Sequence, residues 1–402
     1  MPSNGDQEIT FFGRTNARQP YWEFGIRRPD RLSHMYVIGK TGTGKSTLLE
    51  TMLRQDIARG EGCALIDPHG DLVDRVYQFT HGIGRQDIVY LDFADPALRY
   101  GYNPIAHVSP ERRALVASGI LEVMKKMWAD AWGVRMEHVL RNALLALLDQ
   151  PSATLPDILL LLTDKAYRAE AIQHIQHEPV RAFWTKEYGN YSWRYRADAI
   201  APIQNKVGAF LADPRAHGFL TRSENPLRFR TIMDEGRVLL VNLAKGSIGE
   251  DTASLLGGLI VTSIGLAAFT RTDKPAAARR PFWLYVDEFQ NFTTLSFATM
   301  LSELRKFGVG LVLAHQYLDQ LKPDIREAVI GNAGTLISFR LGANDARDIA
   351  REFSPIFKPD DLLRLENHEL YLRLMIDGMP SHPFSGRSLH PDELGKALTL
   401  PF

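Results

Sequence analysis

Short runs of apolar residues alternate with helical patterns in two separated stretches of the chain. In the first stretch, strand-like runs at 36–38, 64–67 and 87–92 accompany a helical pattern at about 45–59. The second stretch holds further strand-like runs, again separated by helical patterns, at 238–242, 283–287, 310–314, 335–339 and 369–374. Such alternation is typical of a mostly parallel sheet that is covered by helices on both faces, so we predict an α/β fold.

The pattern changes between about residues 109 and 230. Apolar residues recur there at helical spacing, as in Leu140, Leu144, Leu147 and Leu148 and in Ile158, Leu161 and Leu162. Nothing in this stretch alternates as a strand does. We therefore predict an all-helical domain at 109–230, inserted between the two parts of the α/β domain at 1–108 and 231–402. The first part begins with a short β-rich lead-in, and the second ends in a C-terminal tail.

A glycine-rich segment follows the first apolar run. It matches the eight-residue Walker A pattern G-x-x-x-x-G-K-[ST], with an apolar strand before it and a helical pattern after it. Glycines let backbone N–H groups close around phosphate oxygens, and the N-terminus of the helix adds partial positive charge. Lys45 is expected to reach the β- and γ-phosphates, and Ser46 to offer its hydroxyl to Mg²⁺. The predicted ATP-binding residues are Gly39, Thr41, Gly42, Thr43, Gly44, Lys45, Ser46 and Thr47.

A second motif has the form of a Walker B strand. The apolar run Phe282–Val286 ends in Asp287 and Glu288. We expect Asp287 to hold Mg²⁺ and Glu288 to orient and deprotonate the attacking water. Two solvated acids at the end of a strand are the alternative, but the Walker A segment upstream favours the catalytic role and indicates hydrolysis as well as binding.

Two further side chains are candidates for sensing or stabilising the phosphates. Gln316 follows the run at 310–314, at the tip of the strand expected beside the Walker B strand. Arg305 lies in the helical segment between these strands, and a guanidinium suits phosphate oxygens because of its permanent charge and planar fork. The alternatives are a loop glutamine and a solvated helix arginine paired with Glu303. Arg340, at the end of a later strand, is a second arginine candidate.

The chain resembles the HerA/FtsK superfamily and, within it, the TraG-like coupling ATPases of type IV secretion and conjugation. Besides the Walker A segment, the residues that carry the resemblance are Ala64–Leu72, Tyr102–Pro104, Leu255–Gly257, Tyr285–Phe289 and Ala314–Gln316. The resemblance implies a RecA-like P-loop NTPase domain interrupted by an all-helical domain. It also implies subunits that form a homohexameric ring around DNA and drive the DNA by ATP hydrolysis.

Specific roles follow from the resemblance. Lys45 and Ser46 become nucleotide ligands, and Gln316 becomes the sensor. The family has an arginine that acts in a neighbouring subunit's site eleven positions before the glutamine, where this chain has Arg305. Asp67 falls where the family keeps an acidic residue near the nucleotide. A relaxosome or secretion-channel protein is a further expected partner.

Composition and charge limit the setting. Lys plus Arg equals Asp plus Glu at 47 each, so DNA contacts are expected in local patches and not over the whole surface. The single cysteine, Cys63, excludes an internal disulfide framework and a cysteine-rich zinc site. The longest apolar stretch, about 255–269, is shorter than the roughly 20 residues of a membrane span. We therefore expect a buried helix, no direct membrane insertion and a cytoplasmic location. Membrane-anchored coupling proteins begin with transmembrane helices, so this chain would work without an anchor or with one from a separate subunit.

Three segments are candidate contacts for DNA. Basic residues gather just before the Walker B strand, at Arg271, Lys274, Arg279 and Arg280. Residues 291–294 follow the same strand. Aromatic and basic residues are interleaved at 184–196, a composition that suits stacking on single-stranded bases but equally suits a helical core with a basic rim. An ordinary solvated linker remains the alternative for the first segment.

The predicted activity is therefore ATP-driven translocation of DNA, in conjugation or in a related mobile-element, viral or defence process. Two alternatives stay open. One is a secretion-type motor that acts on protein substrates, and the other is a nucleotide-gated switch with little turnover. Glu288 argues against the switch, because that residue is suited to hydrolysis.

Overall fold

The computed structural model describes residues 9–17 and 19–398, and for 395–398 the backbone only. These residues form two compact units. The first unit comprises the described residues up to Leu91, Phe229–Leu243 and the described residues from Ala267 onward. The second comprises Asp92–Arg228 and Ala244–Leu266.

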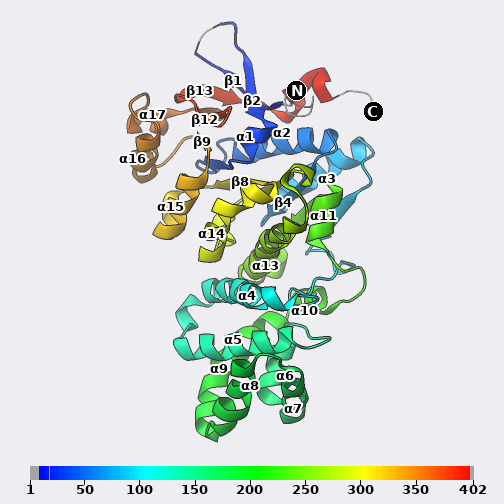
Figure 1. Cartoon of the computed structure of the whole chain (residues 1–402). Helices are drawn as coiled ribbons and strands as arrows, with labels where there is room; N and C mark the ends of the chain where they lie inside the picture. The colour runs from blue at the N-terminus through cyan, green and yellow to red at the C-terminus, as the bar shows by residue number, and fades with distance from the viewer. Residues whose placement is uncertain (1–8, 18, 399–402) are drawn as a thin grey trace. The chain divides into compact units, whose positions relative to one another are not determined.

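The first unit is built on an 11-stranded sheet with the order β2-β1-β13-β10-β9-β3-β8-β7-β4-β6-β5. Figure 1 labels some of these strands, among them β4, β8 and β9. Its strands are β1 (Ile9–Thr15), β2 (Glu23–Arg27), β3 (Met35–Ile38), β4 (Gly62–Asp67), β5 (Ile88–Asp92), β6 (Val238–Asn242), β7 (Phe282–Val286), β8 (Val309–His315), β9 (Thr335–Ser338), β10 (Glu369–Arg373) and β13 (Phe384–Ser388). A small separate sheet pairs β11 (Met375–Ile376) with β12 (Met379–Pro380).

The middle of the large sheet is parallel. β3 lies between β8 and β9, and β4 lies between β6 and β7. β7 pairs with β8, which joins the two sets. Every residue of β3, β4, β6 and β7 is buried, as expected for strands that are covered on both faces. The eight strand-like runs of the sequence all correspond to strands, and the predicted mostly parallel α/β fold is confirmed.

One end of the sheet is antiparallel. β10 pairs with β9 and with β13, and β13 pairs with β1. β1 then pairs with β2, so the β-rich lead-in forms the outer edge of the same sheet as the parallel central strands. The sequence patterns did not indicate this arrangement, because the lead-in and β13 are far apart along the chain.

Helices of the first unit pack on the sheet through apolar residues spaced at helical intervals. In α2 these include Leu49, Met52 and Leu53, which share one buried cluster with Val37 of β3 and Leu65 of β4. The longer α-helices of this unit are α2 (Lys45–Ala58), α3 (Asp71–Gly82), α11 (Phe229–Glu235), α14 (Leu295–Leu304), α15 (Pro323–Asn332), α16 (Ala343–Glu352) and α17 (Pro359–Arg364). A short helix, α1 (Arg28–Arg31), precedes β3.

The second unit consists mainly of helices. They are α4 (Arg113–Met127), α5 (Val134–Leu148), α6 (Asp157–Thr163), α7 (Lys165–His174), α8 (Glu178–Ala182), α9 (Trp193–Leu211), α10 (Pro214–Thr221), α12 (Lys245–Ile248) and most of α13 (Glu250–Phe269). Leu140 and Leu144 of α5 are fully buried, as are Ile158 and Leu161 of α6. We propose that the inserted helical domain is this unit, with Ala244–Leu266 as a part that the sequence did not assign to it.

One apolar helix is longer than the sequence indicated. Among the described residues, Glu250–Asp273 is the one helix long and apolar enough to cross a membrane by length and composition. Within the structure, however, 78% of its apolar window is buried. Burial of this kind is what the core helix of a folded domain shows, in agreement with the helix expected at 255–269.

Candidate nucleotide site

The glycine-rich segment forms the loop between β3 and α2, and α2 begins at Lys45. Gly44 has φ 121°, in a region that residues with a Cβ rarely adopt. A Cβ atom on Gly39 would lie 2.6 Å from the Cβ of Phe339. The loop therefore needs glycine at both positions, and it presents its backbone at the N-terminus of a helix of 14 residues, where anions bind favourably.

Lys45 points back into this loop. Its Nζ donates hydrogen bonds to the carbonyl oxygens of Gly39 at 2.6 Å and Lys40 at 3.1 Å. The side chain is only 6% exposed. Burial lowers the pKa of Lys45, and the nearby acids Glu288 and Asp287 oppose that shift. The ammonium group thus lies within the loop that is expected to surround the phosphates.

Ser46 and Asp287 face each other from α2 and the end of β7. The Ser46 hydroxyl donates to Asp287 Oδ2 at 3.4 Å. Burial, together with the charges of the neighbouring acids Asp67 and Glu288, raises the pKa of Asp287 to about 7 against the opposing charge of Lys45. A divalent cation would stabilise the ionised form of such a buried carboxylate.

The donors present suit Mg²⁺, which keeps several waters and takes one or two carboxylates plus phosphate oxygens. Ser46 and Asp287 would supply the protein ligands. Among the described residues there is no group of three or more His, Cys, Asp or Glu side chains that could hold a metal.

Glu288 lies at the centre of a chain of polar side chains. Its backbone has φ 47°, and its side chain is 8% exposed. Gln316 Nε2 donates to Glu288 Oε1 at 2.8 Å, and Gln290 Nε2 donates to Glu288 Oε2 at 2.7 Å. Thr41 of the glycine-rich loop donates to Gln316 Oε1 at 2.9 Å. The structure thus brings together Thr41, Glu288 and Gln316, three of the residues predicted for the site.

A cavity of about 630 Å³ opens beside this chain. It is lined by Lys40 and Thr41 of the loop, Gln316, Tyr317 and Asp319 after β8, and residues 342–345 at the start of α16. Its volume lies within the range of roughly 300–1,000 Å³ that is usual for small-molecule sites.

A buried cluster of rings lies beneath the site. Tyr36 of β3, Phe289 and His315 have ring centroids 4.8 to 6.1 Å apart. The hydroxyl of Tyr36 hydrogen-bonds to His315 Nε2. Burial, together with the charge of Lys45, lowers the pKa of His315 to about 3, so the ring is neutral. Through this cluster, β3, which leads into the glycine-rich loop, packs against β8, which leads to Gln316. Both strands also contact the turn after Glu288.

Asp67, the last residue of β4, accepts hydrogen bonds from backbone N–H groups of the segment that follows. Its Oδ1 accepts from the backbone N–H of His69 at 2.8 Å. Its Oδ2 accepts from the N–H groups of Leu72 at 3.0 Å and Val73 at 3.3 Å, at the start of α3. The carboxylate therefore satisfies N–H groups at the N-terminus of a helix, and its charge also acts on Asp287.

The structure does not bring Arg305 together with the other predicted site residues of the same chain. Arg305 is exposed in a 3-10 turn, Arg305–Phe307, that follows α14. It lines a separate cavity of about 480 Å³, whose wall also includes His34, Glu352 and Arg373. Arg340 donates instead to Leu365 O and Asn367 Oδ1, and it forms part of the fold near the loop.

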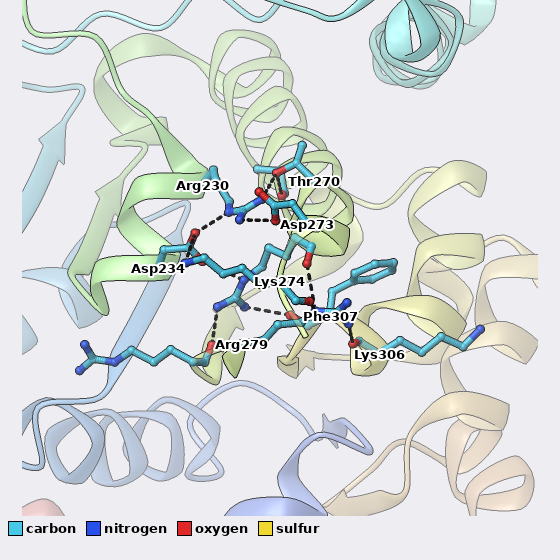
Figure 2. Close-up of polar contacts among 11 residues, drawn as sticks. Arg230, Asp234, Thr270, Asp273, Lys274, Arg279, Lys306 and Phe307 are labelled. Carbon is cyan, nitrogen blue, oxygen red and sulfur yellow. Dashed lines mark hydrogen bonds and ion pairs between the residues drawn. The ribbon is translucent and has the colours of Figure 1, made fainter. Parts of the chain in front are cut away.

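The basic segment before β7 is largely tied into the protein (Figure 2). Arg271 is fully buried and bonds to Asp234 Oδ1 at 3.0 Å and to the carbonyl oxygens of Phe307 at 2.8 Å and Arg280 at 2.6 Å. Lys274 forms an ion pair with the same carboxylate at 2.9 Å. The prediction of Arg271 as a DNA contact is therefore wrong, because its side chain is enclosed by these partners.

The same cluster includes Arg279 and Arg280, which donate to backbone carbonyl groups. Arg279 bonds to the carbonyl groups of Arg271, Lys274 and Lys306. Arg280 bonds to those of Glu235 at 2.7 Å and Gly60 at 2.6 Å. These arginines hold the segment before β7 in place.

The aromatic and basic residues at 184–196 divide into two groups. Trp184 and Tyr188 are buried in the helical unit, which fits the packing alternative. Trp193, at the start of α9, is 84% exposed, and Arg135 stacks on Tyr195 at 4.3 Å. Stacking on single-stranded bases thus remains a prediction for Trp193 and Tyr195.

Sequence reasoning missed Gln290 and the role of Asp67 in capping α3. The sequence held only a weak indication of the role of Gln290. A polar residue two positions after Glu288 lies on the turn that follows it, where its side chain can reach the carboxylate. Asp67 belonged to the segment that carried the family resemblance. Its bonds to backbone N–H groups could not be predicted, because they depend on the geometry with which α3 begins after β4.

Comparisons with known proteins agree with this architecture. The family model described as the central domain of helicase HerA matches residues 28–264. A second model, the DNA-binding domain of type IV secretion-system coupling proteins, matches residues 247–354. Among curated proteins, the type 4 coupling protein DotL of Legionella pneumophila is 23% identical over 84% of this chain. The chain spans 50% of the length of that relative.

Solved structures show the same fold at low sequence identity. The plasmid coupling protein TrwB in complex with ADP and Mg²⁺ has a TM-score of 0.64 and 16% identity, covering 89% of this chain and 86% of that one. VirB4 of Thermoanaerobacter pseudethanolicus has a TM-score of 0.64 and 14% identity, covering 96% and 97% respectively. Both therefore share the mostly parallel sheet of this chain.

Proposed function

We propose that this chain, which belongs to the family of the HerA helicase central domain, is an ATP-hydrolysing motor that moves DNA. The observation that carries the proposal is the convergence of Lys45, Asp287 and Gln316 at the carboxyl ends of β3, β7 and β8. These strands are adjacent and parallel, so their carboxyl ends meet at one edge of the sheet, where α/β proteins bind ligands.

ATP and Mg²⁺ fit the residues present. The loop N–H groups and Lys45 would hold the phosphates, and Ser46 and Asp287 would hold the metal, which supplies positive charge to the γ-phosphate. Glu288 would accept a proton from the attacking water, and Gln316 would contact the γ-phosphate. The coupling protein TrwB, which shares this fold, binds ADP and Mg²⁺ in its solved complex, and this supports the same cofactors here.

DNA as the substrate rests on the match of residues 247–354 to the coupling-protein DNA-binding model and on the coupling protein DotL as a relative. From the family resemblance we further propose a homohexameric ring in which Arg305 acts in a neighbouring subunit. A relaxosome or secretion-channel protein is the proposed partner. The proposed compartment is the cytoplasm, and the one cysteine of the chain, Cys63, is a buried free thiol, which suits it.

Steady-state ATP hydrolysis by the purified protein tests the proposal. It would be measured without polymer, with duplex DNA and with single-stranded DNA, and Lys45→Ala would serve as the control. Strong stimulation by one form of DNA, lost in Lys45→Ala, would support a DNA motor and identify its track. A rate indifferent to DNA would instead favour a motor for protein substrates, and binding without turnover would favour a nucleotide-gated switch.

A further inference from the structure

We propose that Gln290 is a positioning residue for hydrolysis, which holds the Glu288 carboxylate in the orientation that accepts a proton from water. This inference rests on the proposed function, because it assigns a role within the same site. It concerns a residue that neither the Walker motifs nor the sensor prediction included. The contacts of Glu288 and the packing of its turn carry the argument.

The two oxygens of Glu288 have different partners. Oε1 accepts from Gln316 at 2.8 Å, and Oε2 accepts from Gln290 at 2.7 Å. A carboxylate has no proton to donate, so both amides must present their N–H groups to it. Hydrogen bonds to an ionised group are about twice as strong as neutral ones, so two of them fix the plane of the carboxylate.

The two amides differ in what else they contact. Gln316 also accepts a hydrogen bond from Thr41 of the glycine-rich loop, so its position depends on the loop and on the phosphates the loop would hold. Gln290 lies on the short turn Phe289–Asn291, directly after Glu288. When Gln316 turns toward a γ-phosphate, Gln290 keeps hold of Oε2 and leaves Oε1 free for water.

The turn that carries Gln290 is itself anchored. Phe289 is fully buried, with its ring edge-to-face against Tyr36 at 6.1 Å and against His315 at 4.8 Å. Glu288 has φ 47° and ψ 47°, a left-handed conformation that non-glycine residues seldom adopt. The backbone thus places residues 288 and 290 so that their side chains meet. A catalytic group held in place in this way loses less freedom when the reaction begins.

Gln290→Met tests the inference, because methionine has a similar length and volume but no N–H donor. We expect kcat for DNA-stimulated ATP hydrolysis to fall about 10- to 100-fold, the value of one hydrogen bond to a charged group. The KM for ATP is expected to change less than about twofold, since Gln290 lies on the turn after Glu288 and is not part of the glycine-rich loop. Gln78→Met is the matched control, because Gln78 is exposed on α3.

Gln290→Glu gives a second measurement. Its carboxylate retains the shape of the side chain but repels Glu288, so kcat is expected to fall at least as far as in Gln290→Met. Thermal melting and binding of a fluorescent ATP analogue would accompany both variants. Melting temperatures and affinities close to wild type, together with reduced kcat, would support a positioning role.

The outcomes separate this inference from the proposed function. A wild-type kcat in Gln290→Met beside an inactive Glu288→Gln would overturn the inference and leave the motor intact. Parallel losses of kcat, ATP affinity and melting temperature would also overturn it, because they indicate a structural role. Absence of hydrolysis in the wild-type protein with every form of DNA would overturn the proposed function itself.

Discussion

The guanidinium of Arg31 and the carboxylate of Asp56 form a two-bond ion pair, with distances of 2.6 and 2.8 Å, in the interior of the first unit. Tyr285 of the Walker B strand joins them, because its hydroxyl contacts both groups. The Arg31 guanidinium also lies 3.9 Å over the ring of Trp283. This cluster connects α1, α2 and β7, and so fixes the helix that begins at Lys45 to the strand that Asp287 follows.

Asp56→Asn is expected to destabilise the protein by about 3–5 kcal/mol, because it leaves the buried Arg31 without its counter-charge. Urea unfolding followed by circular dichroism would measure the change. Glu303→Gln is the matched control, since Glu303 pairs with Lys306 at 2.7 Å on the surface. That change should cost less than about 1 kcal/mol. Equal losses of stability in the two variants would contradict the view that burial makes the Arg31–Asp56 pair more important than the exposed Lys306–Glu303 pair.

The cluster around Asp234 gives a second prediction about stability. Arg271→Met removes the donor to Asp234 and to two carbonyl groups, each of which is costly to leave unpaired, so a loss of about 3 kcal/mol is expected. Lys274→Met should have little effect, because the side chain of Lys274 is 40% exposed. Thermal melting of both variants checks this. A stable Arg271→Met protein would show that the cluster contributes little.

Glu288→Gln is expected to bind ATP with Mg²⁺ as the wild type does but to hydrolyse it at least about 100-fold more slowly, since the amide cannot accept the proton. Equilibrium binding and single-turnover hydrolysis would be measured on the same preparation. Ser46→Ala should instead weaken Mg²⁺-dependent binding. Hydrolysis by Glu288→Gln at the wild-type rate would exclude Glu288 as the base.

Arg305 offers a test of action between subunits. Lys45→Ala and Arg305→Ala should each abolish DNA-stimulated hydrolysis. A mixture of the two should recover part of the rate, because an Arg305→Ala subunit with an intact loop can receive Arg305 from a Lys45→Ala neighbour. ATPase assays over a series of mixing ratios measure this recovery. Activity no greater than that of the separate variants would contradict a shared site.

His34 predicts how stability depends on pH. Its ring is buried between Leu301 O, at 2.8 Å from Nε2, and the N–H of Leu311, at 3.2 Å from Nδ1. Burial, opposed by the hydrogen bond to Leu301 and aided by the charge of Arg305, lowers the pKa of His34 from 6.5 to about 4. Because the folded-state pKa is depressed, protonation favours unfolding.

The contribution of His34 is therefore present in full above pH 6.5 and is lost as the pH falls toward 4. The loss amounts to about 3 kcal/mol over that range. Urea unfolding between pH 7 and about 4.5 would compare wild type with His34→Asn, since asparagine tolerates the φ of 64° at this position. The free energy of unfolding of the variant should fall less steeply. Parallel curves would contradict the assignment.

Sequence patterns predicted those parts of the fold that depend on local order. The strand at 238–242 and the helix that begins at Lys45 have the bounds that apolar runs and the Walker A pattern indicate. The antiparallel end of the sheet was not predicted, because the pairing of Gly13 with Ser388 joins segments with no local signal for each other. Register between distant strands depends on the whole set of packing contacts.

In the candidate site, too, the residues that belong to local motifs were predicted, whereas contacts between distant segments were not. Thr41, Glu288 and Gln316 were predicted from motifs, and the structure brings their side chains into one hydrogen-bonded chain. Arg271 was misjudged because a basic residue in a polar segment normally faces solvent. Its burial follows from the carboxylate of Asp234 and from carbonyl groups on a turn near Phe307, neither of which is close in sequence.

The order of strands in the sheet has a consequence for how the chain is made on the ribosome. β3 obtains its neighbours only when β8 and β9, Val309–Ser338, have been synthesised, and β4 must wait for β6 and β7. The helices of the second unit emerge in between and form mainly local contacts, so they can fold first. Until β6 has been synthesised, the nascent chain thus carries two apolar strands without their central partners, and exposed strands of this kind favour the binding of chaperones.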